Sequence, residues 1–257
     1  MTHRLSDNER EALARDGYVL REGVFTRDEV REIVDACEQL VTGLVDGRQS
    51  TRYHVGSYTF DPDQLTGCTI KWEGDTDVVH GIEPFAHLSP ELEKWAYDPR
   101  LIDPSIDFVG DPEPALFTEK LNLKRPHHGG PNPFHQDHPY WVGVADDPLR
   151  VVTAMLFLDD ASLENGTLEV IPGSHTSGEW PRRTDADFFG RFEMDPAAAE
   201  GKPTVPIEVE AGAVVFFGAL LVHKSNPNTS DRDRRALLYS YQPKGFTHML
   251  DVVRRGT

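Results

Sequence analysis

Two separate segments of the chain carry side chains that can bind one metal ion. His135-Gln136-Asp137 places an imidazole and a carboxylate two residues apart, and the apolar stretch VVFFGALLVHKS leads to His223. Residues i and i+2 of an extended strand project from the same face, so His135 and Asp137 can reach the same ion. Two histidines and one carboxylate form a facial triad with open coordination positions, an arrangement suited to non-haem Fe(II).

A pair of arginines follows His223 where a co-substrate site would need a cation. The open positions of such an iron centre can take dioxygen and a 2-oxo acid such as 2-oxoglutarate, whose remote carboxylate then needs a fixed positive charge. A guanidinium meets that need because it binds a carboxylate through two parallel hydrogen bonds. Arg234 and Arg235 open the apolar strand ALLYSY. Neighbouring strand residues face opposite sides, so one of the two points inward, and the spacing leaves open which.

The N-terminal part of the chain is expected to be mainly helical. Ser6 with Glu9 and Thr26 with Glu29 form capping boxes that predict two helix starts, and apolar residues between 30 and 44 recur at helical spacing. Residues 45–85 are polar and rich in turn residues, and we interpret them as loops. A further short helix is predicted from Ser89-Pro90.

After about residue 114 the pattern changes to short strands separated by turn residues. One of these turns, Asn165-Gly166, is typical of a tight hairpin. We therefore expect one domain over 1–257, mainly β with flanking helices, divided into a helical part over about 1–113 and a β-barrel core over about 114–243. The charged, Phe-containing stretch 176–203 is predicted to be one long insertion between strands.

Composition excludes several classes of partner. The 43 acidic and 26 basic residues give a formal charge of -17, which repels nucleic acid and anionic membrane surfaces. No apolar run approaches the roughly 20 residues that a membrane-spanning helix needs, and the N-terminus lacks the apolar core of a secretory signal. We expect a cytoplasmic protein that acts on a small molecule. The oligomeric state is not indicated.

Three blocks of sequence together resemble the phytanoyl-CoA dioxygenase family of Fe(II)/2-oxoglutarate oxygenases. They are HQDHPYW, LDDASLENGTLEVIPGSHTSG and AGAVVFFGALLVHKSNPNTSDRDRRAL, and the resemblance covers about residues 115–243. It implies a double-stranded β-helix, a cupin-like jelly-roll barrel, with iron bound by His135, Asp137 and His223. It also implies that Arg234, rather than Arg235, binds the C5 carboxylate of 2-oxoglutarate.

The resemblance extends to other residues of the co-substrate pocket. Ser225 matches a position that hydrogen-bonds the carboxylate of 2-oxoglutarate, and Lys120 and Met155 match positions that line the pocket. Many family members add a basic residue from the N-terminal half, for which both Lys71 and His80 are candidates.

The predicted reaction is the oxidation of a small organic molecule by dioxygen, most simply a hydroxylation, with release of succinate and carbon dioxide. Desaturation, cyclisation and epoxidation use the same centre. Halogenases of the family lack the carboxylate ligand, so Asp137 disfavours halogenation. Candidate substrate contacts come from HPYW and the long insertion: His138, Tyr140, Trp141, Trp180, Phe188 and Phe189.

Two alternatives stay open at this stage. One is a metal dioxygenase or isomerase of the same fold that needs no 2-oxo acid, and the other is a binding protein with a residual metal site. A second metal site at His127 and His128 is also conceivable, although we interpret these two histidines as loop-packing residues.

Overall fold

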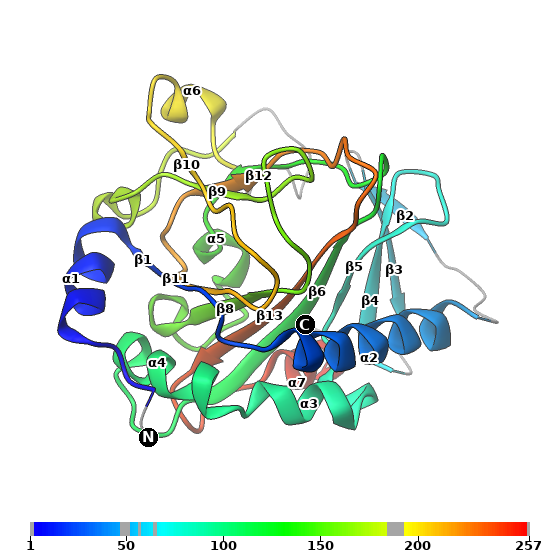
Figure 1. Ribbon diagram of the computed structural model, residues 1–257, viewed down its shortest axis with the longest axis horizontal. Helices are drawn as coiled ribbons and strands as arrows, with labels where there is room; N and C mark the ends of the chain where they lie inside the picture. Colours follow the sequence, from blue (N-terminus) through cyan, green and yellow to red (C-terminus); the bar gives the residue numbers. More distant parts are fainter. Residues whose placement is uncertain (1–2, 47–51, 56–57, 64–65, 184–192, 256–257) are drawn as a thin grey trace.

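The computed structural model describes residues 3–46, 52–55, 58–63, 66–183 and 193–255 of the 257. Within these residues the strands form two antiparallel sheets (Figure 1). The large sheet contains, in spatial order, β1 (Tyr18–Arg21), β11 (Val214–Gly218), β8 (Val152–Phe157), β13 (Arg234–Gln242), β6 (Ala115–Lys124), β5 (Val79–Glu83), β4 (Cys68–Glu73), β3 (Tyr58–Asp63) and β2 (Tyr53–Val55). The small sheet contains β10 (Val205–Pro206), β9 (Leu168–Val170), β12 (His223–Ser225) and β7 (Asn132–His135).

Helices flank the sheets. The longer ones are α1 (Asp7–Asp16), α2 (Arg27–Val45), α3 (Pro90–Ala96), α4 (Pro99–Val109) and α7 (Met249–Arg255), and single turns are formed by α5 (His138–Trp141), α6 (Pro196–Ala199), η1 (Ala86–Leu88), η2 (Pro148–Arg150) and η3 (Ser174–Ser177). Both predicted capping boxes are confirmed, at Ser6 with Glu9 and at Thr26 with Glu29. Ser89 caps α3 as expected, its hydroxyl accepting a hydrogen bond from Leu92 N. No helix in the described part of the chain is long and apolar enough to cross a membrane.

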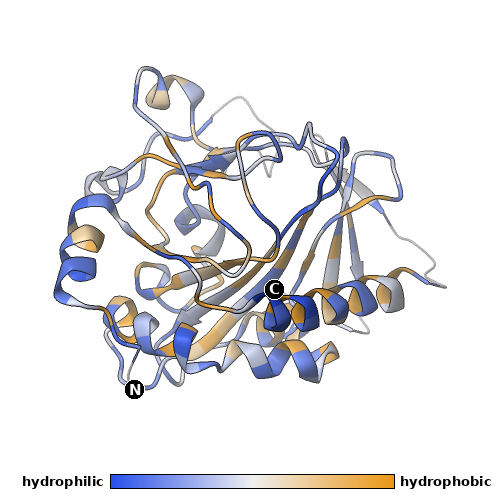
Figure 2. Ribbon diagram, viewed as in Figure 1, coloured by the Kyte–Doolittle hydropathy of each residue, from blue (hydrophilic) through white to orange (hydrophobic). Residues whose placement is uncertain are grey.

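The helices α2, α3 and α4 cover the outer face of the large sheet (Figure 1). Their apolar residues join those of the strands in one buried cluster, and two tyrosines of β13 attach α3 directly. The Tyr239 hydroxyl donates to Leu92 O at 2.6 Å, and the Tyr241 hydroxyl to Ala96 O at 2.7 Å. In Figure 2 α2 and α3 each carry hydrophobic and hydrophilic residues, as expected for helices that bury one face.

The inner face of the large sheet faces the small sheet across a second apolar cluster. Met155, Phe157 and Val215 of the large sheet meet Leu168 and Val170 of the small sheet there. Because strand residues alternate in direction, the interior also receives every second residue of β13 and β6. The two sheets thus enclose a barrel interior, and the expected mainly β fold with flanking helices is confirmed.

The interpretation of residues 45–85 as loops is wrong. Four antiparallel strands, β2, β3, β4 and β5, extend the large sheet beyond β6, so the part before residue 114 is not simply helical. The pattern was obscured because the inner face of β4 and β5 carries polar residues. Lys71 and His80 lie on these strands, and their neighbours Ile70 and Trp72 supply the apolar alternation on the other face.

The expected hairpin at Asn165-Gly166 is also wrong. The strands that flank it, β8 and β9, belong to different sheets, and the turn carries the chain from one sheet to the other. Asn165 holds the turn by accepting from Ser162 N at 2.8 Å and donating to Asp160 O at 2.8 Å. Gly166 has φ +76°, and a Cβ there would lie 2.4 Å from Asn226 O, so the turn requires glycine.

Candidate active site

The two histidines of the triad lie opposite one another on paired strands of the small sheet. His135 ends β7 and His223 begins β12, and the pairing register places them side by side with ring centroids 4.1 Å apart. The Nε2 atoms of His135 and His223 lie 3.9 and 4.0 Å from Asp137 Oδ1. The three candidate ligand atoms all fall within 4.8 Å of one another, which is close enough to hold one ion.

Asp137 does not lie on an extended strand as expected. β7 ends at His135, and Asp137 is the N-cap of α5 with helical backbone angles of φ -70° and ψ -28°. The carboxylate still reaches the two imidazoles because the chain turns at Gln136, whose side-chain amide donates to Gly178 O at 2.9 Å and to Leu220 O at 2.7 Å. The buried Gln136 therefore fixes the turn that presents Asp137.

Backbone carbonyls orient both imidazoles. His135 Nδ1 lies 2.8 Å from Pro133 O, and His223 Nδ1 lies 2.9 Å from Leu221 O. A carbonyl can only accept, so each Nδ1 donates to it, and Nε2 is the nitrogen that each ring turns toward Asp137 and can offer to a metal. Burial and the adjacent His223 also lower the pKa of His135 well below its usual range. Neutral imidazoles with free Nε2 lone pairs are the form that binds a metal.

Arg234 points into the barrel interior and Arg235 points away from it. Arg235 Nε and Nη2 lie 2.9 and 2.7 Å from the carboxylate of Asp159, and its Nη1 lies 3.1 Å from Glu38 of α2. Arg234 is 2% exposed, and its Nε and Nη1 have no hydrogen-bond partner in the described residues. Burial lowers the pKa of Arg234 to about 10. The guanidinium is therefore a buried cation at neutral pH with unused donors.

The other residues predicted for the co-substrate pocket also lie on interior faces. Ser225 follows His223 by two residues on β12, is buried, and accepts a hydrogen bond from Asn132 at 3.3 Å. Met155 of β8 and Lys120 of β6 both lie opposite Leu238 of β13, one on each side. These residues thus share the interior with Arg234 and the triad.

The structure also shows a cluster of polar residues next to Arg234, on the side of the large sheet that ends at β2. Lys124 lies opposite Arg234, and its ammonium donates to Gly130 O at 2.6 Å and to Asn226 O at 2.5 Å. The Lys71 ammonium lies 3.6 Å from the centre of the Tyr58 ring, and burial, followed by the charge of Lys120, lowers its pKa to about 7.

His80, the other basic candidate from the N-terminal half, belongs to the same cluster and bonds to Glu73. Lys124 was not predicted. Its signal in the sequence was the alternation Lys120, Asn122, Lys124, which places three polar residues on one face of β6.

The predicted substrate contacts separate into different environments. Tyr140 is 36% exposed and its ring stands edge-on to His135 at 5.9 Å. His138 Nδ1 lies 2.6 Å from Glu179. Trp141 is 6% exposed and packs edge-on against Phe117, which makes it a core residue.

The long insertion is described only in part. Trp180 is partly buried, and its backbone N–H donates to the Gln136 side chain at 2.8 Å. Phe188 and Phe189 lie outside the described residues.

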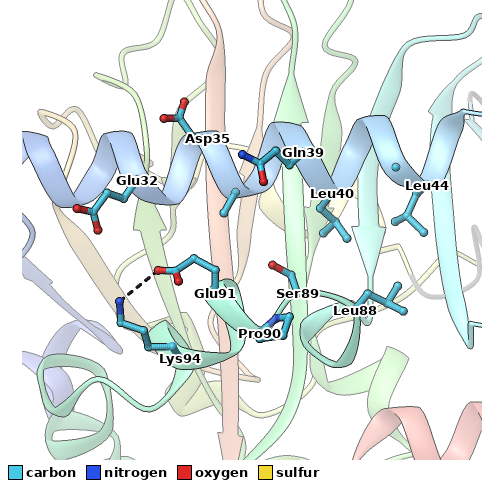
Figure 3. A pocket seen from close by; sticks show the side chains of 12 residues that line it. Glu32, Asp35, Gln39, Leu40, Leu44, Leu88, Ser89, Pro90, Glu91 and Lys94 are labelled. Carbon is cyan, nitrogen blue, oxygen red and sulfur yellow. Dashed lines mark hydrogen bonds and ion pairs between the residues drawn. The ribbon is translucent and has the colours of Figure 1, made fainter.

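In the part of the chain that the structure describes, neither a second metal site nor a surface groove competes with the triad. His127 is exposed and bonds to Asp231 at 2.7 Å, and the described residues contain no other group of three side chains placed to hold an ion. Figure 3 shows a groove between α2 and the η1–α3 segment, lined by Leu40, Leu88 and Glu91 among others. It lies on the helical side of the large sheet, whereas the triad lies in the barrel interior.

Two facing antiparallel sheets that carry a two-histidine, one-aspartate centre define a non-haem metalloprotein of the double-stranded β-helix class. Residues 13–236 match the model of the family described as Phytanoyl-CoA dioxygenase (PhyH). The chain belongs to this family of Fe(II)- and 2-oxoglutarate-dependent oxygenases, as its sequence predicted.

Curated relatives and solved structures agree with this assignment. The chain is 27% identical to phytanoyl-CoA dioxygenase domain-containing protein 1 of Rattus norvegicus over 91% of this chain and 89% of that one. It is 29% identical to L-proline trans-4-hydroxylase of Streptomyces griseoviridis over 66% of this chain and 69% of the hydroxylase. The structure resembles the α-ketoglutarate-dependent carbocyclase SnoK from nogalamycin biosynthesis with a TM-score of 0.72 and 24% identity, covering 96% of this chain and 88% of SnoK. It also resembles EctD from S. alaskensis in its apo form, with a TM-score of 0.71 and 25% identity over 93% of this chain and 77% of EctD.

Proposed function

We propose that this oxygenase hydroxylates a small organic molecule, with Fe(II) on His135, Asp137 and His223 and 2-oxoglutarate on Arg234. The observation that carries the proposal is the Arg234 guanidinium, which is buried in the same barrel interior as the triad with two nitrogens unpaired within the described residues. A buried unpaired charge costs several kcal/mol, so such a group calls for an anionic ligand.

The donor set fits ferrous iron. Two neutral imidazoles and one carboxylate suit Fe(II) and leave room for further ligands on the open side. When bound, Fe(II) with 2-oxoglutarate activates dioxygen for the oxidation of a C–H bond and releases succinate and carbon dioxide. The role of the protein is to hold the three ligands in place. The carbonyls of Pro133 and Leu221 orient the two imidazoles.

The co-substrate is proposed to lie between the triad and Arg234. Arg234 binds its C5 carboxylate, Ser225 offers a hydroxyl to the same group, and Met155 and Lys120 line the pocket. Below about pH 7 the Lys71 ammonium adds positive charge to this region, because its pKa is lowered to about 7. Since the pocket is enclosed by the two sheets, its charged groups act at a low dielectric constant and attract a dicarboxylate strongly.

Hydroxylation is favoured over the other oxidations by two observations. Asp137 completes the ligand set, so its carboxylate occupies the coordination position that a halide would need. The curated relatives named above include a proline hydroxylase, which aligns with two thirds of this chain. The structural similarity to a carbocyclase keeps ring closure as the second candidate reaction.

The proposal is tested by supplying the purified protein with Fe(II), 2-oxoglutarate and air, together with a panel of metabolites. Succinate should form in proportion to an oxidised product whose mass is greater by one oxygen atom. A product that has lost two hydrogens instead would identify desaturation or ring closure. Succinate formed with no oxidised product from any metabolite class would contradict the assignment of a small-molecule substrate.

A further inference from the structure

The turn that follows β6 folds back over the last residue of that strand, Lys124. His128 N and Gly129 N donate to Arg125 O at 3.1 and 3.0 Å, which closes the turn. The chain then returns toward its start, so that Lys124 Nζ donates to Gly130 O at 2.6 Å. A Cβ on Gly129 would lie 2.5 Å from Lys124 Cβ, so this close return requires glycine. The segment 124–130 thus encloses the side chain of its own first residue.

The same Nζ bonds to the chain where it leaves β12. It donates to Asn226 O at 2.5 Å and to Ser225 O at 3.5 Å. Gly166 lies on another side of the lysine, where a Cβ would be 3.0 Å from Lys124 Cδ. Lys124 is 1% exposed, so backbone carbonyls take the place of water around Nζ. Lys124 therefore joins the segment that enters β7 to the segment that leaves β12.

These bonds close one end of the strand pair that carries the two candidate histidine ligands. In the register of β7 and β12 the two histidines pair with each other, and Ser225 pairs with Asn132 further toward that end. Ser225 is adjacent to Asn226, whereas His223 is three residues away from it. Each histidine is also held by a backbone carbonyl of its own. Lys124 therefore acts most directly on the end of the pair that presents Ser225.

Lys124 is also the partner of Arg234 in the large sheet. The two residues lie opposite each other in the pairing of β6 and β13. In the loop that leads to β13, the Asn228 side chain donates to Lys124 O at 2.8 Å, and its backbone N–H donates to Gly129 O at 2.8 Å. Burial, and after it the charge of Arg234, lowers the pKa of Lys124 to about 6. At neutral pH Lys124 therefore adds little charge of its own beside Arg234.

We propose that Lys124 is a positioning residue for 2-oxoglutarate. In the described residues the bonds of its Nζ go to backbone carbonyls, and through them Lys124 holds Ser225 and Arg234 in the relative positions that one carboxylate needs. The inference rests on the proposed function, and it adds a residue that supports the co-substrate site without binding the co-substrate. Loss of Lys124 should therefore weaken 2-oxoglutarate selectively, and iron much less.

The test replaces Lys124 by methionine, which is unbranched and of similar length but has no N–H to donate. Anaerobic titrations measure the affinity of the protein for Fe(II) and then the affinity of the iron-loaded protein for 2-oxoglutarate, through the visible band. The Kd for 2-oxoglutarate should rise by about 10- to 100-fold, as is typical when a group that supports a binding residue is lost. The Kd for Fe(II) and the intensity of the band at saturating 2-oxoglutarate should stay close to those of the wild type.

Two tyrosines of β13 provide the matched control. The hydroxyls of Tyr239 and Tyr241 also donate from buried side chains to backbone carbonyls, at 2.6 and 2.7 Å, but they do so on the outer face of the same sheet. The double variant Tyr239→Phe with Tyr241→Phe should lower the melting temperature, as Lys124→Met does, because it also leaves buried carbonyls unpaired. Its affinity for 2-oxoglutarate should be that of the wild type.

Three results would overturn the inference. They are a Lys124→Met variant with wild-type affinity for 2-oxoglutarate, an equal loss of affinity for Fe(II) and 2-oxoglutarate, and a tyrosine control that loses 2-oxoglutarate as strongly. If Lys124→Met does not fold, Lys124→Gln, which keeps N–H donors on a shorter side chain, is measured instead and should show the same selective loss. Wild-type protein that develops no band would refute the proposed function, whereas a normal wild-type band with an unaffected Lys124 variant would refute this inference alone.

Discussion

Replacing Arg234 by methionine should separate co-substrate binding from folding. Methionine is similar in length and apolar, so it fills the buried site without the charge. A bidentate arginine–carboxylate contact contains two charge-assisted hydrogen bonds, each contributing about 1.5–3 kcal/mol. Since 1.4 kcal/mol is a factor of ten in affinity, Arg234→Met should weaken 2-oxoglutarate binding by at least about 100-fold.

The same substitution should not destabilise the protein without ligand. Arg234 Nε and Nη1 are buried and unpaired within the described residues. Replacing such a group by an apolar one of similar volume is neutral or stabilising by about 1–4 kcal/mol. At about 2–4 °C per kcal/mol for a domain of this size, the melting temperature should stay constant or rise by a few degrees.

Arg235→Met is the matched control, because the neighbouring residue faces the other way. It removes the contacts to Asp159 and Glu38 and should lower stability by about 1–2 kcal/mol. Its affinity for 2-oxoglutarate should remain that of the wild type. Calorimetry with 2-oxoglutarate in the absence of oxygen and a thermal melt of each variant measure both quantities. An Arg235 variant that loses 2-oxoglutarate, or an Arg234 variant that keeps it, would refute the assignment.

Three further predictions concern other parts of the site. Because the pKa of Lys71 is lowered to about 7, its ammonium loses a proton as the pH rises through 7. The kcat/KM for 2-oxoglutarate should therefore fall above that pH, and Lys71→Met should abolish this pH dependence. Asp137→Ala should weaken Fe(II) binding by more than about 100-fold in an anaerobic titration, since loss of even an outer partner of a metal ligand costs about 10- to 100-fold. Gly166→Ala should lower the free energy of unfolding in urea by about 2–4 kcal/mol, because its Cβ would meet Asn226 O, whereas Gly143→Ala, which has φ +82° but open space, should cost only about 1 kcal/mol.

The candidate metal ligands could be predicted from the sequence because metal binding restricts residue type and spacing together. A histidine and a carboxylate two residues apart, a second histidine after an apolar strand and an arginine eleven residues later are each common, but their combination is not. The choice between Arg234 and Arg235 needed either the family resemblance or the structure. Strand alternation shows only that the two arginine side chains point in opposite directions. Tertiary packing decides which of them contacts Asp159.

The strands β3, β4 and β5 could not be recognised from residue pattern alone. Sequence patterns identify strands through an apolar face, but the inner faces of β4 and β5 contain Lys71 and His80. These polar residues face inward where the interior is proposed to bind a charged co-substrate rather than to form an apolar core throughout. The failure of the pattern at this place coincides with the polar cluster beside Arg234.

The position of Asp137 illustrates a similar limit. The expected strand ends two residues early, and Asp137 reaches the histidines from the start of α5. The turn depends on Gln136 bonding to Gly178 and Leu220, residues far away in the sequence. The spacing therefore predicted three residues that the fold brings together, although the local conformation differed from the one assumed.

The most direct test of the central claim is an anaerobic titration of the purified protein with Fe(II) followed by 2-oxoglutarate. A weak visible charge-transfer band should appear only when both are present and should saturate at one equivalent of each per chain. His223→Ala should lack the band because the triad loses a ligand, while His127→Ala, at an exposed site, should retain it. Folded wild-type protein that develops no band would contradict the account.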